Sequence, residues 1–75
     1  KAKLIVKTLD GQPLLTLSSE VKVSLDRGRI VLVSSDLRRE FSKDNLLLEF
    51  KGSFNVKTDR GETKVSDTQL VLSLP

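Results

Sequence analysis

The chain has 75 residues, with 13 Lys and Arg against 10 Asp and Glu, and it contains no Cys and no His. A chain of this size forms one small domain with a thin core, because it buries only about 60% of the surface that its unfolded form exposes. The missing Cys and His exclude disulfides and thiolate metal sites, and they remove the commonest general base and nucleophile pairs from any proposed chemistry.

Alternating apolar and polar residues define the expected strands of the first half. Neighbouring side chains of a strand point to opposite faces, so this period of two is typical of strands with one buried side. Pro13 stands at a strand start, where the missing N–H of proline is tolerated. The segment 30–33 is apolar on both faces and is expected to be a central strand or one that a partner covers. The expected buried faces before it are Leu4 with Val6, Leu15 with Leu17, and Val21 with Val23 and Leu25.

The second half continues the alternation and shows no helical pattern of useful length. Gly52 interrupts it, and we expect this glycine to make either a hairpin turn or a bulge inside one long strand from Leu46 to Thr58, where a bulge would bend the sheet. The expected buried faces are Leu37 with Phe41, Leu46 with Leu48 and Phe50, Phe54 with Val56, Thr63 with Val65, and Leu70 with Leu72 and Leu74.

Turn signals separate these segments at nearly even spacing. Gly, Asn and Asp tolerate the positive φ of tight hairpin turns, and many short strands at this spacing indicate an all-β fold. We predict an antiparallel strand meander of about eight short strands, arranged as an open β-jellyroll or a sandwich. Residues 1–75 should form a single small β-domain, processed or excised from a longer chain because Lys1 stands in place of Met. The two series of breaks are Asp10-Gly11, Asp26-Arg27-Gly28, Lys43-Asp44-Asn45 and Asp59-Arg60-Gly61, and Ser18-Ser19-Glu20, Ser34-Ser35-Asp36, Lys51-Gly52-Ser53 and Ser66-Asp67-Thr68.

The acidic residues give no basis for catalysis. They either stand in turns or, like Glu40 and Glu49, alternate outward from strands, so they are not expected to converge in a cleft. No calcium loop, phosphate-binding loop or dinucleotide fingerprint occurs. We therefore predict a protein that is not an enzyme, with no catalytic residue, no metal site and no cofactor.

The basic excess is spread along the chain, which favours a solvated sheet face over a nucleic-acid footprint. Arg38-Arg39 is the only basic doublet, and its two side chains should point to opposite faces. No apolar run approaches the roughly 18 residues of a membrane span. The charge pattern therefore does not predict a nucleic-acid partner, and the apolar runs do not predict a transmembrane segment.

Short segments of the type "apolar, small, small, acid, apolar" alternate with segments of the type "Gly, x, apolar, x, apolar" in residues 17–23, 26–30, 48–56 and 61–72. In this pattern most of the chain resembles the lipopolysaccharide-transport bridge proteins of the Gram-negative periplasm. The resemblance implies an open β-jellyroll whose apolar interior holds acyl chains and whose ends join other jellyrolls. It also implies a periplasmic or extracytoplasmic location and lipid or lipopolysaccharide as a ligand, whereas the residues alone are equally compatible with the cytoplasm.

A ligand surface in such an interior would consist of inward-facing apolar residues. The same residues would equally serve to fill the core, which is the commoner role of buried aliphatic side chains. The candidates are Val23, Leu25, Leu48, Phe50, Phe54 and Val56.

A second resemblance lies in the last third of the chain, in residues 50–58 and 61–64. These segments resemble the C-terminal strands of the tryptophan RNA-binding attenuation protein, a ring of all-β subunits, and the resemblance implies an RNA-binding ring subunit. The Lys-x-Arg pair with which that family contacts RNA is matched here by Glu49 and Lys51, so an acid replaces one basic contact. An acid at this position opposes a phosphate-rich partner.

A third hypothesis is a structural or protein-interaction domain. It needs only exposed strand edges, to which a partner can add a strand, and a thin core that gains from association. Similar short segments at 6–11 and 56–61 favour stacked strands with open ends. We therefore expect self-assembly into a homo-oligomer, or association with a related β-domain.

Overall fold

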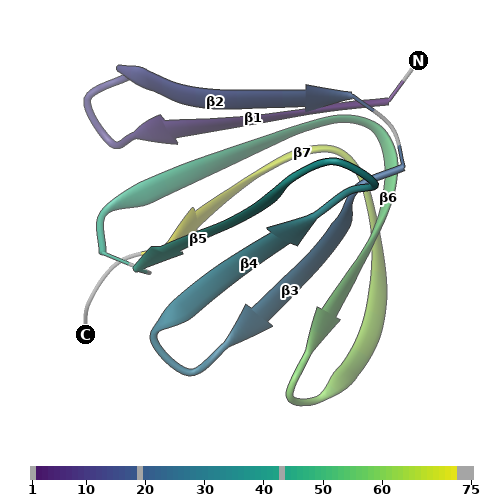
Figure 1. The fold of residues 1–75 in the computed structure, drawn as a ribbon. Helices are drawn as coiled ribbons and strands as arrows, with labels where there is room; N and C mark the ends of the chain where they lie inside the picture. The colour runs from purple at the N-terminus through teal and green to yellow at the C-terminus, as the bar shows by residue number, and fades with distance from the viewer. Residues whose placement is uncertain (1, 19, 43, 73–75) are drawn as a thin grey trace.

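The computed structural model describes residues 2–18, 20–42 and 44–72 and confirms the all-β class (Figure 1). Seven strands form one curled, mixed sheet. The predicted positions Lys1, Ser19, Lys43 and Leu74 lie outside the described residues. The strands are β1 Lys3–Thr8, β2 Pro13–Ser18, β3 Lys22–Asp26, β4 Arg29–Val33, β5 Arg38–Ser42, β6 Leu46–Thr58 and β7 Gly61–Leu72.

The long strand β6 organises the sheet. The strand order is β2-β1-β6-β3-β4-β5, and β7 pairs with β6 along its other edge. One edge of β6 is shared by two strands, because residues 46–51 pair with β1 and residues 56–57 pair with β3. The β3–β6 pairing is parallel, whereas the other pairings are antiparallel. The chain therefore departs from a simple antiparallel meander at the point where β3 meets β6.

Two of the predicted breaks lie inside strands rather than between them. The pairs Phe50↔Thr68 and Ser53↔Ser66 leave two residues of β6 opposite the single Asp67 of β7. Gly52 has φ 78° and Asp67 has φ 46°, and the Gly52 N–H donates a 2.8 Å hydrogen bond to the Asp67 carboxylate. The bulge interpretation of Gly52 is confirmed, and the hairpin-turn interpretation is wrong. Because these two breaks do not end strands, the described residues contain fewer and longer strands than expected.

The bulge bends the β6–β7 hairpin, which sweeps around one side of the molecule in Figure 1. Bulges increase local bending and twist, so the β1–β2 hairpin and the β3–β5 strands come to lie on the two arms of one curl. Their inner faces share a single core, which consists of Leu4, Val6, Val21, Val23, Ile30, Leu32, Leu46, Leu48, Phe50, Phe54 and Val56.

The period-two pattern correctly predicts the buried face of the alternating strands, whereas the continuously apolar segment 30–33 shows no preference between its two faces. In β4, Ile30 and Leu32 are fully buried, whereas Val31 and Val33 on the other face are only half-buried. β4 lies between β3 and β5 within the sheet. It is thus an interior strand with a partly solvated outer face, and burial on both faces is not observed.

Replacing Gly52 with alanine should destabilise the fold. A Cβ at this position would lie 2.9 Å from the Ala2 Cα, in addition to the unfavourable φ. We expect G52A to lower the free energy of unfolding by about 2–4 kcal/mol, combining the left-handed backbone penalty with overpacking. Urea denaturation measures this change.

The matched control is G28A. Gly28 has φ 66°, but no atom lies within 4 Å of the position of an added Cβ. Its substitution should cost only the backbone penalty of about 1–2 kcal/mol. Equal losses for the two variants would contradict a role for the close approach of Ala2 to Gly52.

Candidate functional site

The predicted ligand-binding residues come together, but as part of a filled core. Five of them, Val23, Leu48, Phe50, Phe54 and Val56, are buried. The Phe50 and Phe54 rings flank the bulge with centroids 5.5 Å apart and planes tilted by 58°. Leu25 is half-buried and packs against the edge of this core. Of the six, Leu25 alone is therefore substantially accessible from outside.

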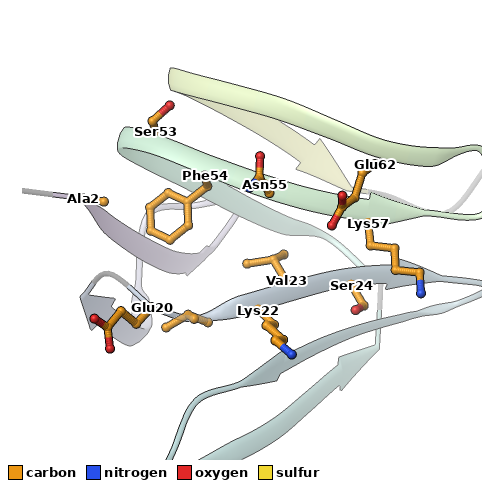
Figure 2. A pocket seen from close by; sticks show the side chains of 11 residues that line it. Ala2, Glu20, Lys22, Val23, Ser24, Ser53, Phe54, Asn55, Lys57 and Glu62 are labelled. Carbon is orange, nitrogen blue, oxygen red and sulfur yellow. The ribbon is translucent and has the colours of Figure 1, made fainter.

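A surface cleft of about 560 Å³ opens where β3 and β6 separate. These strands pair only at Val23↔Val56 and Ser24↔Lys57, so the sheet is split ahead of that point. Figure 2 shows Val23 and Phe54 projecting between the strands, with charged residues around them. The charged residues of the lining are Glu20, Lys22, Lys57 and Glu62. Two acids and two bases select neither an anion nor a cation. Among the described residues, no group of three or more His, Cys, Asp or Glu side chains could hold a metal ion.

Three strands pair on one side only within the described part of the chain, and two of them carry features that discourage further pairing. β5 has an inward-facing charge, because Arg39 lies opposite the buried Leu32, with its guanidinium carbon 5.4 Å from the centre of the Phe41 ring. β2 begins at Pro13, which has no backbone N–H to donate to a further strand. Inward charges and proline are devices that protect sheet edges.

The third of these strands, β7, has a free edge over residues 61–72, which we call the β7 edge. It spans 12 residues, contains no proline and pairs only with β6 among the described strands. Its inner-face residues Val65, Leu70 and Leu72 pack against the core but stay half-buried. The β7 edge thus combines unpaired backbone with apolar side chains that a partner could cover.

Exposed apolar side chains gather at one end of the sheet, next to the end of β7. Leu9, Leu14 and Val71 are 46%, 40% and 58% exposed. Val71 lies opposite Leu47 of β6, which in turn lies opposite Lys7 of β1. Leu9 follows β1, and Leu14 lies at the start of β2. Both are at this same end of the sheet, where Figure 1 places the β1–β2 turn and the tip of β7.

The outer face carries two small ionic networks. The Lys7 ammonium lies 3.2 Å from the Glu49 carboxylate, and the Gln69 amide donates a 2.9 Å hydrogen bond to it. Hydrogen bonds from Gln69 and then Lys7 lower the pKa of Glu49 below its ordinary value. This network spans β1, β6 and β7. Glu49, the acid that stands where the RNA-binding family has a basic contact, is therefore paired with Lys7 of its own chain.

The second network confirms that Arg38 and Arg39 point to opposite faces. Arg38 hydrogen bonds to the Glu40 carboxylate on the outer face, whereas Arg39 lies over Phe41. Arg29 also contacts Glu40, at 3.0 Å. The hydrogen bond and charge of Arg38, with a smaller contribution from Arg29, lower the pKa of Glu40.

Comparison with protein-family models, curated proteins and solved structures finds no match to this chain. The two family resemblances therefore stay predictions. The described residues contain no helix of the length and apolarity that a bilayer crossing requires.

The β7 edge is the feature that sequence reasoning missed. The turn-forming residues Ser66-Asp67-Thr68 predict a break, which would divide β7 into two short segments. No local sequence signal distinguishes a bulge from a turn at this position, because the same residue types favour both.

The network around Glu49 predicts a dependence of stability on pH. Because the folded-state pKa lies below the unfolded value, the carboxylate stabilises the fold above about pH 4.5, and this contribution is lost as the pH falls through the folded-state pKa. We expect E49Q to lower the urea midpoint at neutral pH and to approach the parent protein at acidic pH. D36N removes an exposed acid outside the ion pairs of the described residues. If D36N reproduced the profile of E49Q, the network would not be the cause.

Proposed function

We propose that this chain is a non-catalytic association module, which joins another β-sheet of the same architecture through the β7 edge. The observation that carries the proposal is a strand of 12 residues that pairs on one side only and whose inner-face apolar residues stay half-buried. A partner strand would satisfy the unpaired N–H and C=O groups and cover Val65, Leu70 and Leu72 together. Strand addition of this kind is a common mode of protein recognition.

The size of the domain also supports association. A chain of this length has a thin core. Association would bury further apolar surface, and each Å² of it contributes about 25 cal/mol of favourable free energy. The resemblance to lipopolysaccharide-transport bridge proteins implies the same mode of action, with β-domains joined to one another. The partner would then be a second copy of this chain or a related β-domain.

A charge introduced on the inner face of the β7 edge should weaken association. Thr68 is exposed and lies opposite the buried Phe50. We expect the mass of the parent protein to rise with concentration in sedimentation velocity, and T68K to raise the dissociation constant at least about tenfold, since a charge facing inward on an edge opposes pairing.

The control is T16K, which places the same charge on an exposed threonine of the β2 edge. It should leave the dissociation constant unchanged. A strictly monomeric parent protein at high concentration, or equal effects of the two lysines, would refute association through the β7 edge.

A second proposed function, the binding of acyl chains, is favoured by half-buried apolar residues around the core. In this proposal the chain works in the periplasm, as the resemblance implies, and a lipid chain lies against these side chains. Because the core itself is filled, the acyl chain would contact its margin. The residues concerned are Leu15, Leu17, Leu25, Phe41, Val65, Leu70 and Leu72.

Substitution of Leu25 tests this second proposal. L25Q should weaken the binding of a fluorescent fatty acid severalfold, because it replaces the one accessible member of the predicted ligand-binding set with a polar side chain. L9Q changes an exposed leucine that does not pack against the core, and it should leave binding unchanged. A parent protein that does not bind the probe in a fluorescence titration would exclude the acyl-chain function.

A further inference from the structure

We infer that the partner at the β7 edge is a second copy of this chain, paired antiparallel along the whole of β7 about a two-fold axis between Ser66 and Asp67. This inference rests on the proposed function and specifies its partner and register. It follows from the position of the bend, from the order of inner and outer side chains along β7, and from the positions of the charges.

The irregularity at Asp67 inverts the alternation of β7. Val65 faces inward before it, and Leu70 and Leu72 face inward after it, so the inner-face positions change from odd to even numbers. It also divides the strand into two halves of six residues, 61–66 and 67–72. An antiparallel copy aligned over the full strand places residue 61 opposite residue 72, and each inner-face residue then meets an inner-face residue.

No like charges lie directly opposite one another in this register; the two Asp67 residues flank the axis, where each carboxylate accepts a hydrogen bond from the Gly52 N–H of its own chain. On the inner face, Val65 lies opposite Thr68 of the second copy, and Thr63 lies opposite Leu70. On the outer face, Lys64 lies opposite Gln69, and Glu62 lies opposite the exposed Val71. A register centred within one half of β7 pairs fewer residues than a register over the full strand. If it is centred on Lys64, it also places the two Lys64 residues opposite each other. Like charges directly opposite each other destabilise a strand pair.

The bend is compatible with this symmetry. A two-fold axis perpendicular to the sheet at the midpoint of β7 exchanges the two arms of the curve and keeps both inner faces on the same side. The two curled sheets then continue into one another, with the same surface used by both copies. The other described free edges would not pair in this way, because β5 carries the inward Arg39 and β2 begins at Pro13.

Paired charge variants at Val71 test the register. V71K places a lysine opposite Glu62 of the second copy, twice per dimer, whereas V71E places a glutamate there. Both remove the same exposed valine, so their effects on the isolated chain are matched, and far-UV circular dichroism and urea midpoints check this. We expect V71K to dimerise at least about tenfold more tightly than V71E in sedimentation velocity at low ionic strength.

Single cysteines give a second readout, because the chain has no Cys of its own. In the inferred register the two Ser66 residues flank the axis at a separation that a disulfide can span. The two Lys64 residues lie about 17 Å apart, five residues along the strand. S66C should therefore form a covalent dimer on oxidation. K64C alone should not, whereas a mixture of K64C and Q69C should.

The outcomes separate this inference from the proposed function. Tighter dimerisation of V71K than V71E, together with S66C cross-linking, supports the register. Two outcomes would overturn the two-fold pairing but leave the proposed function standing. In the first, T68K weakens association but the charge at position 71 has no effect; in the second, the protein forms open-ended oligomers. A parent protein that stays monomeric overturns both.

Discussion

The contact between Gly52 and Asp67 is the constraint on which the rest of the fold depends. Two residues of β6, Lys51 and Gly52, lie opposite the single Asp67 of β7. Gly52 and Asp67 both have positive φ, and the Gly52 N–H donates a hydrogen bond to the Asp67 carboxylate. A straight hairpin of this length would present one flat face to water. With the bend, its two halves face each other, and Phe50 and Phe54 on either side of the bulge pack together at 5.5 Å.

The bend also divides one edge of β6 between two neighbours. The strand leaves β1 after Lys51 and meets β3 only at Val56, so the cleft in Figure 2 lies in the intervening gap. The opposite edge of β6 is covered without such a gap by β7. The bend is therefore associated with the buried core, with the cleft between β3 and β6, and with a long strand that has one free edge. The free edge combines unpaired backbone with incompletely buried apolar side chains.

A filled core changes how the six predicted ligand-binding residues are interpreted. Five of them are buried by neighbouring side chains of the same chain, which is how aliphatic residues most often reach low exposure. Any ligand of this domain would have to be bound at its margins. The family resemblances were based on local segments of alternating residues, and such segments do not encode whether the space between two strands is filled or open.

The sequence by itself determined the strand class, the inner face of most strands and the principal turns, because these depend on interactions between residues close along the chain. Alternation correctly assigned Leu4, Val6, Leu46 and Leu48 to the core, and positive φ was correctly expected at Gly11, Gly28 and Gly61. Only the tertiary structure decided that Ser66-Asp67-Thr68 continues a strand, that β3 pairs in parallel with β6, and that the β7 edge is open. These features depend on which distant strands meet, and a turn residue has the same local preferences in a bulge as in a hairpin.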